Sequence, residues 1–321
     1  MLNVYLLVAV NTSASHKSAT RESMILPRKL IKVGKKFTQE AYSALPFPGV
    51  SSPVFIIGCG RSGTTIFGTA LSKHRDITYL NEPHHLWFSA YPETDIWTHK
   101  ANHREGKLFL TSNDAHPRKR KKLSRLFQFE TVVSGKPILV EKLPINNFRL
   151  EFIKENFPDA RFIHIYRNGL EVARSIEEFS KRGEWFGANS YKWERLVKYA
   201  KELDGVNKLP QFCTSYFDKG LLEWRLSTEA AVEFLCSLSD DEFFEVSYDE
   251  FIGNPVGTII RAKDYIGVDF DRNVKAFVSD CVARRTSKLN QKEISEKVQM
   301  LGGKLLPLSM DGGKGLSKRC S

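Results

Sequence analysis

Residues 53–71 read PVFIIGCGRSGTTIFGTAL and have the features of a buried strand, a glycine-rich turn and the start of a helix. Residues 54–57 form a continuous apolar run, which is typical of a parallel strand covered on both faces. Three glycines in residues 58–63 leave the backbone free to wrap closely around a ligand. The apolar residues that follow recur on one side of a helix from about Thr64. This order predicts an anion-binding turn at the positive end of a helix dipole.

The spacing of the turn is close to that of a phosphate-binding P-loop. Gly58 and Gly63 fit G-x-x-x-x-G-K-[ST], but Thr64 stands where the lysine belongs. The lysine of a P-loop reaches the β- and γ-phosphates of ATP or GTP, and Arg61 is the cation that this turn offers instead. Because a sulfonate carries less negative charge than a phosphoryl group, it needs less positive charge from the protein to neutralise it. The turn therefore disfavours phosphoryl transfer from a nucleoside triphosphate.

Composition limits the class of protein. A hydrophobic fraction of 41% and a charged fraction of 26% are ordinary for a globular chain of 321 residues. The net charge of +11 suits an acidic ligand such as a nucleotide, a sulfated polymer or an acidic peptide. No zinc-finger or aromatic-basic RNA motif is present, so we expect no nucleic-acid partner. The five cysteines are scattered and form no C-x-x-C pair, which indicates neither a zinc site nor a disulfide framework.

Strands and helices alternate along the chain. Strands are expected at 54–57, 77–80, 137–142, 160–166 and 243–248, and helices from about 64 and at 147–157, 169–181, 191–203, 219–238 and 254–266. This alternation predicts an α/β domain of the P-loop type, with three layers and a central parallel β-sheet flanked by helices. Residues 91–125 are expected to be a polar excursion that is helical in part.

Two regions are expected. Residues 1–48 are interpreted as a poorly structured N-terminal arm, and residues 49–321 as a single α/β domain. The apolar stretch 2–10 is far shorter than the roughly 20 residues that span a bilayer, and no basic segment precedes it. The expectation is a cytoplasmic protein without a membrane span, or a protein of the Golgi lumen if the N-terminus is incomplete.

A second candidate anion site lies about 100 residues after the turn. The strand that ends at Tyr166 is followed by Arg167, at the carboxyl edge where open α/β sheets bind ligands. Ser175 comes eight residues later, in the second turn of the next helix. An arginine and a hydroxyl placed in this way can hold one phosphate from two directions.

These residues resemble the nucleotide site of sulfotransferases that use 3′-phosphoadenosine 5′-phosphosulfate (PAPS). The resemblance covers about residues 50–285, and Tyr248 matches the adenine-contacting tyrosine of that family, although Asp249 replaces its usual glutamate. It implies PAPS as co-substrate, with the 5′-phosphosulfate on the glycine-rich turn and the 3′-phosphate on Arg167 and Ser175. The implied nucleotide-binding residues are Gly60, Arg61, Ser62, Gly63, Thr64, Thr65, Arg167, Ser175 and Tyr248.

The chemistry requires a base for the acceptor proton and positive charge for the leaving phosphate. Glu82 follows the second strand and is similar in spacing to the general base of tyrosylprotein sulfotransferases. Cytosolic sulfotransferases use a histidine, so His84 and His85 are the alternatives. The resemblance also implies that Lys142, with Arg61, offsets the charge of the transferring group. No metal is expected.

Three questions stay open at this point. A degenerate P-loop nucleotide kinase and a non-catalytic nucleotide- or polyanion-binding protein of the same fold are the alternatives to a sulfotransferase. The acceptor is expected to present a hydroxyl or an amine. The basic residues of 118–125 are read mainly as a solvated face and favour only slightly an acidic carbohydrate or peptide acceptor. The oligomeric state is not predicted.

Overall fold

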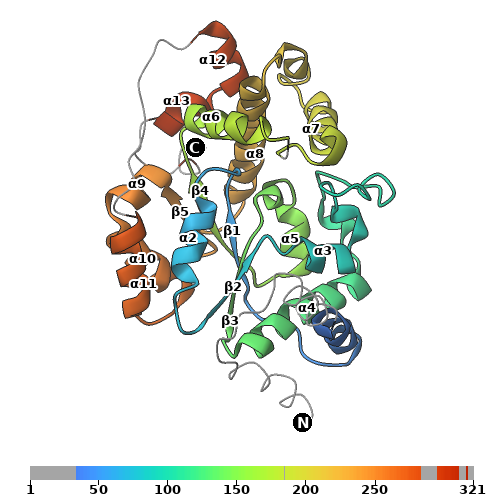
Figure 1. Cartoon of the computed structure of the whole chain (residues 1–321), viewed down its shortest axis with the longest axis vertical. Coiled ribbons are helices and arrows are strands. Elements are labelled where there is room, and N and C mark those ends of the chain that lie inside the picture. Colours follow the sequence, from blue (N-terminus) through green and yellow to red (C-terminus); the bar gives the residue numbers. More distant parts are fainter. Residues whose placement is uncertain (1–33, 184, 283–294, 311–315, 317–321) are drawn as a thin grey trace, which may run out of the picture.

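Five parallel strands form the centre of the molecule (Figure 1). The computed structural model describes residues 34–183, 185–282, 295–310 and 316. The strands are β1 (Val54–Ile57), β2 (Ile77–Asn81), β3 (Ile138–Lys142), β4 (Arg161–Tyr166) and β5 (Phe243–Ser247). Their order across the sheet is β2-β3-β1-β4-β5, and every neighbouring pair is parallel. The predicted α/β class and parallel sheet are therefore confirmed.

The central strand β1 is buried on both faces, as its apolar run predicts. Phe55 and Ile57 belong to one hydrophobic cluster, and Val54 and Ile56 belong to the other. All four side chains are at most 1% exposed. Because successive side chains of a strand point to opposite faces, this strand anchors both layers of helices.

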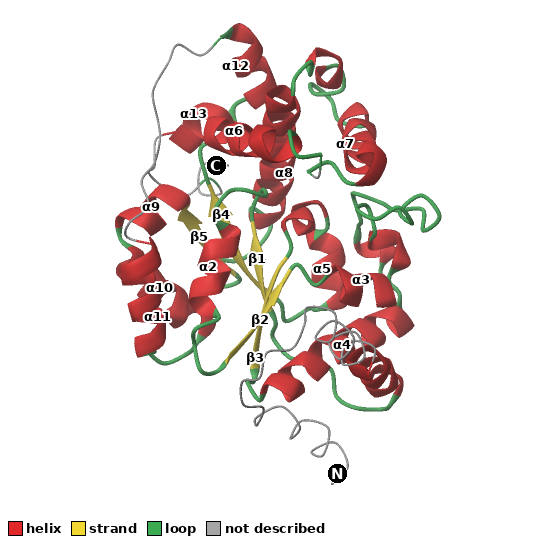
Figure 2. Ribbon diagram, viewed as in Figure 1, coloured by secondary structure: helices red, strands yellow, loops and turns green. Residues whose placement is uncertain are grey.

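Helices cover the two faces of the sheet (Figure 2). One layer contains α2 (Thr64–Leu71), α9 (Tyr248–Gly253), α10 (Pro255–Ile266) and α11 (Arg272–Phe277). The other contains α3 (His84–Ala90), α4 (Pro117–Ser134), α5 (Leu150–Asn156) and α8 (Tyr216–Leu235). The helices α6 (Gly169–Ser180), α7 (Tyr191–Lys201), α12 (Glu296–Gly302) and α13 (Leu305–Met310) lie toward the carboxyl ends of the strands. Short 3₁₀ segments are Pro92–Thr94, Ser112–Asp114, Pro144–Phe148, Ala188–Ser190 and Leu209–Phe212, and Val278–Val282 is a π-helical turn.

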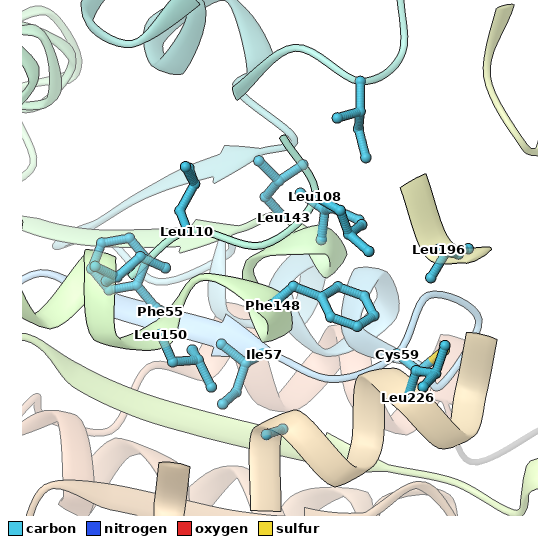
Figure 3. Packing of buried hydrophobic residues seen from close by; sticks show 14 of the residues in the cluster. Phe55, Ile57, Cys59, Leu108, Leu110, Leu143, Phe148, Leu150, Leu196 and Leu226 are labelled. Atoms are coloured by element: carbon cyan, nitrogen blue, oxygen red, sulfur yellow. The ribbon is translucent and has the colours of Figure 1, made fainter. Parts of the chain in front are cut away.

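The larger hydrophobic cluster extends from the sheet to the carboxyl edge (Figure 3). Phe148 lies in this cluster between β1 and the helices α7 and α8, with Leu196 and Leu226 nearby. Cys59 of the glycine-rich turn belongs to the same cluster and is 2% exposed. The turn therefore packs against the hydrophobic core through Cys59, which fixes its position.

One segment differs from the sequence-based expectation, and a second agrees with it. Residues 34–44 form a helix within the N-terminal arm that was expected to be poorly structured, and its Lys35 and Gln39 both contact Glu130 of α4 at 2.8 Å. The excursion 91–125, which was expected to be helical in part, leads into α4, an 18-residue helix. Because the first half of α4 is rich in basic residues, its apolar face is hard to recognise in the sequence. The remainder of the arm, residues 1–33, lies outside the described residues, as does part of the C-terminal segment.

Candidate active site

Each strand delivers a candidate residue at its carboxyl end. The glycine-rich turn follows β1, Glu82 follows β2, and Lys142 ends β3. Arg167 follows β4, and Tyr248 follows β5. Because carboxyl ends of parallel strands meet at one edge, five distant segments converge there. The residues predicted for the site therefore lie at one edge of the sheet.

The glycine-rich turn needs glycine where it contacts Tyr248, the first residue after β5. Gly63 has a φ of 95°, and a Cβ on it would lie 2.3 Å from the Tyr248 ring. At the start of the turn, the N–H of Gly58 donates to Asn147 Oδ1 at 2.8 Å. Asn147 in turn donates to the carbonyl and hydroxyl of Ser227 at 3.1 and 3.0 Å. The turn is therefore held by side chains of neighbouring segments, Asn147 and Tyr248, and not by its own sequence alone.

The two predicted halves of the nucleotide site are in contact. Arg61 Nε donates to Ser175 Oγ at 3.0 Å, and Arg167 Nη1 donates to the carbonyl oxygen of Arg61 at 3.2 Å. The Arg167 guanidinium also lies 4.3 Å from the centre of the Tyr248 ring. The side chain of Arg61 is thus directed toward α6, where it also stacks on Phe179 at 4.4 Å. These contacts join Arg61, Arg167, Ser175 and Tyr248 into one cluster, although Arg61 and Ser175 alone are 114 positions apart in the sequence.

A cavity of about 270 Å³ lies beside this cluster. Its lining includes Arg61, Gly63, Thr64, Thr65, Ile66, Thr69, Arg167, Ser175 and Tyr248. Burial and the nearby charge of Arg167 lower the pKa of Arg61. Two guanidinium groups that converge in this way repel each other, and a bound anion would relieve the repulsion. The hydroxyl of Ser62, which is 1% exposed, has no hydrogen-bond partner among the described residues.

A second cavity, of about 240 Å³, lies on the other side of the turn. Its lining consists of Gly60, Glu82, His84, Trp97, Leu143, Pro144, Ile145, Phe148, Phe179, Trp185, Lys192, Glu223 and Ser227. Gly60 approaches Trp185 so closely that a Cβ on the glycine would lie 2.5 Å from the indole ring. The turn therefore separates a cationic cavity from an aromatic one.

Glu82 and Lys142 form an ion pair at the edge of the aromatic cavity. Lys142 Nζ lies 2.5 Å from Glu82 Oε1, and the lysine side chain is fully buried whereas that of Glu82 is 44% exposed. The N–H of Glu82 also donates to the carbonyl oxygen of Lys142 at 2.7 Å. Glu82 has a φ of 52°, and Arg61 one of 75°. Glu82 and Arg61, two of the three residues predicted to take part in the chemistry, thus have left-handed backbone conformations, which are uncommon for non-glycine residues.

The surroundings of Glu82 keep it ionised. His84 and Lys142 lower the pKa of Glu82 to about 2, against an opposing effect of burial. Burial lowers the pKa of Lys142, whereas Glu82 opposes this shift. Of the two alternative bases, His84 lines the same cavity as Glu82. His85 instead has Glu130 and Lys35 as charged neighbours, on the side of the N-terminal helix.

Several residues of the site escaped the sequence analysis. Asn147 was read only as a helix start, and nothing in its spacing indicated that it would hold Gly58. Lys192 and Glu223 form a buried ion pair at 2.5 Å from two different helices. Trp97 and Trp185 come from irregular segments. The run KLPINN at residues 142–147, with two consecutive asparagines after a strand end, was the one signal that pointed toward a polar support.

The basic run at residues 118–125 lies apart from both cavities. Lys119 pairs with Glu93 at 2.8 Å, and Lys122 pairs with Glu40 at 2.9 Å. Arg125 donates to the carbonyl oxygen of Phe47 at 2.9 Å. These side chains hold α4 against neighbouring segments, so they give no support to an acidic-acceptor contact at the site.

Two further searches covered the described part of the chain. None of its helices combines the length and apolarity that crossing a membrane would require. Within the same residues, no group of three or more histidine, cysteine, aspartate or glutamate side chains is placed to hold a metal ion.

The parallel sheet and the glycine-rich turn at its central strand define an α/β domain of the P-loop type. Residues 53–272 match the model of the sulfotransferase family, which is more than half of the chain. The chain therefore belongs to the sulfotransferase family.

Two mycobacterial proteins are distant relatives of this chain. The chain is 24% identical to the omega-hydroxy-beta-dihydromenaquinone-9 sulfotransferases Stf3 of Mycobacterium bovis and Mycobacterium tuberculosis, over 68% of this chain and 64% of those proteins. The match thus spans less than two thirds of these relatives. Among solved structures, the sulfotransferase domain of the curacin biosynthetic pathway is 14% identical with a TM-score of 0.48, covering 71% of this chain and 77% of that one. The sulfotransferase domain of the Synechococcus PCC 7002 olefin synthase is 16% identical with a TM-score of 0.47, covering 80% and 95%.

Proposed function

We propose that this protein transfers a sulfuryl group from PAPS to a hydroxyl acceptor. The observation that carries the proposal is the arrangement of two cavities on either side of one glycine-rich turn. The cationic cavity offers Arg61, Arg167 and Ser175 to a nucleotide with phosphates on both its 3′ and 5′ sides. The aromatic cavity offers Glu82 to an acceptor. Family membership supports sulfuryl transfer in general, and the donor is our inference.

In the proposed site the 3′-phosphate binds Arg167 and Ser175, through charge and a hydroxyl hydrogen bond. The 5′-phosphosulfate binds amides within Gly60–Thr65, including that of Gly63, at the amino end of α2. Tyr248 packs beside this turn and under Arg167, where an adenine ring or ribose can lie against it. The Arg61 side chain, which is hydrogen-bonded to Ser175, lies beside the 3′-phosphate in this proposal. Its backbone amide faces the 5′-phosphosulfate.

The reaction needs three events at the junction of the cavities. The acceptor hydroxyl gives its proton to Glu82, and its oxygen bonds to sulfur. The bond between sulfur and the 5′-phosphate oxygen breaks in line with this attack, and the phosphate leaves with the electron pair. Lys142, now paired with Glu82, stands beside both carboxylate and transferring group and offsets the developing negative charge.

A hydroxyl acceptor fits the name of the mycobacterial relatives, whose substrate carries an omega-hydroxyl group. An amine would be protonated at neutral pH and would have to lose that proton before it attacked. An ionised Glu82 can accept a proton from a hydroxyl or from a protonated amine. A hydroxyl has to lose only one proton in the reaction, whereas a protonated amine has to lose two.

The test is a transfer assay with sulfur-labelled PAPS in the presence of EDTA, beside a thermal-shift comparison of 3′-phosphoadenosine 5′-phosphate (PAP) with Mg²⁺-ATP. We expect label to reach an added alcohol without free divalent metal, and PAP to raise the melting temperature more than Mg²⁺-ATP. Stabilisation by Mg²⁺-ATP alone would favour a degenerate P-loop kinase. Binding of PAP without transfer to any acceptor would favour a non-catalytic nucleotide-binding protein.

A further inference from the structure

The aromatic cavity has walls that favour an apolar ligand. Trp97, Phe148, Phe179 and Trp185 contribute rings to it, and Leu143, Pro144 and Ile145 complete one side. Phe179 and Trp185 meet edge to face at 6.1 Å. An apolar cavity of about 150 Å³ holds one benzene ring. A cavity of about 240 Å³ therefore has room for one substituted ring or a short branched chain.

The charged groups of this cavity are paired with one another. Lys192 and Glu223 lie 2.5 Å apart and are 1% and 4% exposed. The second carboxylate oxygen of Glu223 accepts from Trp185 Nε1 at 2.7 Å. Glu82 is paired with Lys142. A strongly anionic acceptor would meet two carboxylates here, and each of the two lysines is already engaged.

Lys192 retains hydrogen-bonding capacity toward the cavity. Its ammonium group has three N–H donors, and Glu223 is its one ion-pair partner in the part of the chain that the structure describes. The rings of Trp185 and Trp97 lie 4.2 and 4.8 Å from its nitrogen. Aromatic faces attract the cation but are weak acceptors compared with a carbonyl oxygen. An uncharged oxygen on a ligand can therefore take one of these donors without separating Lys192 from Glu223.

We propose that the acceptor of this protein is a neutral apolar alcohol that carries its hydroxyl at the Glu82 end of the cavity and a carbonyl-type oxygen at the Lys192 end. This inference rests on the proposed function for the role of Glu82. It adds the chemical class of the acceptor and assigns Lys192 as a residue that determines specificity. It differs from the acidic carbohydrate or peptide that the basic run at 118–125 favoured only slightly.

The test measures acceptor binding without chemistry. The enzyme is loaded with PAP, and its tryptophan fluorescence is followed while an alcohol is added, because Trp97 and Trp185 line the cavity. The probes are 4-acetylbenzyl alcohol, 4-ethylbenzyl alcohol and 4-(hydroxymethyl)benzoate, which differ at the end away from the hydroxyl. Chondroitin serves as an acidic glycan. In these benzyl alcohols a methylene group insulates the hydroxyl from the varied substituent.

We expect the acetyl compound to bind roughly tenfold more tightly than the ethyl compound, which is the value of one hydrogen bond to a charged donor. Lys192→Met should reduce this ratio to about one, whereas Lys198→Met, on the exposed side of the same helix, should preserve it. If loss of Lys192 alone unfolds the protein, Lys192→Met combined with Glu223→Gln removes both buried charges together. The comparison of the two probes in the unaltered protein needs no variant.

Equal binding of the acetyl and ethyl compounds would overturn the assignment of Lys192. Tighter binding of the benzoate or of chondroitin would overturn the neutral acceptor class. Neither result touches the proposed donor, because PAP binding is measured first and separately. Absence of PAP binding would instead contradict the proposed function.

Discussion

Glu82 and Arg61 combine chemical roles in the proposal with left-handed backbone conformations, at φ of 52° and 75°. Such conformations cost free energy for residues with a Cβ and persist where surrounding contacts impose them. For Glu82 the contacts are the hydrogen bond to the Lys142 carbonyl and the ion pair with the Lys142 side chain. This position holds the carboxylate at the cavity edge, whereas the next residue but one, His84, already lies in a helix.

Glu82→Gln tests the identity of the base. We expect PAP binding to be retained and transfer to fall by a factor of about 10² or more, because a general base typically contributes this much. Measurement of kcat beside PAP affinity separates the two effects. Loss of PAP binding together with the rate would mean that Glu82 is structural.

The pH dependence of transfer separates Glu82 from His84. The pKa of Glu82 is lowered to about 2, so this carboxylate stays ionised as the pH falls and gains a proton only near that value. We therefore expect kcat to hold between pH 7 and 5 if Glu82 is the base. A histidine base would gain a proton and lose activity across the same interval. A tenfold fall in kcat from pH 7 to 5 would therefore assign the role to His84.

At the scale of single elements, the loop between β1 and α2 depends on a side chain from the segment that follows β3. Asn147 is 1% exposed and connects Gly58 to Ser227 of α8. Lys142 ends the strand β3 that precedes this segment, so the stretch 142–147 both supports the turn and supplies the cation that pairs with Glu82. The structure therefore couples the position of the anion-binding amides to the ion pair with Glu82.

Asn147→Ala should lower the free energy of unfolding by about 1–3 kcal/mol, because the buried N–H of Gly58 loses its acceptor. We also expect weaker PAP binding, since the amides of the turn would no longer be fixed. Urea denaturation and calorimetric titration with PAP measure the two effects. Ser227→Ala is the matched control, because it removes only the hydroxyl contact on the far side of Asn147. Unchanged PAP affinity in Asn147→Ala would show that the turn keeps its shape without this support.

Elements with strong local patterns could be predicted from the sequence, and elements defined by tertiary contacts could not. The apolar runs of β1 and β4 were sufficient because strands buried on both faces have few polar positions. The helix over residues 34–44 was missed because its contacts with another helix, such as those with Glu130, leave no local sequence pattern. The aromatic cavity was missed for the same reason: Trp97 lies in a segment held by Arg149, whose guanidinium donates to the carbonyl oxygens of Thr94, Lys107 and Leu108.

The residues of the candidate site also fall into two groups, those with a local sequence pattern and those placed by tertiary contacts. The turn, Arg167 and Ser175 could be named because they follow strands in a recognisable order, and the structure places them in one cavity. Lys192 and Glu223 carry no such signal, since a lysine and a glutamate in amphipathic helices are usually solvated. Their burial depends on the packing of α7 against α8.

At the scale of the whole molecule, one buried carboxyl group makes stability depend on pH. Glu141 of β3 is fully buried beside Trp87 and Asn146, and burial raises its pKa to about 8. The unfolded chain ionises this group near pH 4.5, whereas the folded protein retains the proton up to about pH 8. The contribution of Glu141 to stability is therefore full below about pH 4.5 and is lost as the pH rises toward 8.

Glu141→Gln removes this dependence. We expect the variant to gain free energy of unfolding relative to the unaltered protein as the pH rises from 5 to 8, by up to about 1.4 kcal/mol per pH unit. Urea denaturation at pH 5, 6, 7 and 8 measures the difference between the two proteins, which cancels the titration of other groups. A difference that stays constant across these pH values would mean that Glu141 is ionised in the fold and held by Trp87 and Asn146.

The central claim is that two separated strand ends together bind a nucleotide with phosphates on its 3′ and 5′ sides. Calorimetric titration of the protein with PAP and with adenosine 5′-phosphate tests it most directly, in the unaltered protein, in Arg167→Ala and in Arg174→Ala, which alters an exposed arginine on the helix α6 that follows Arg167. We predict that PAP binds at least tenfold more tightly than adenosine 5′-phosphate, and that Arg167→Ala abolishes this preference whereas Arg174→Ala preserves it. Equal affinity for the two nucleotides in the unaltered protein would contradict the account.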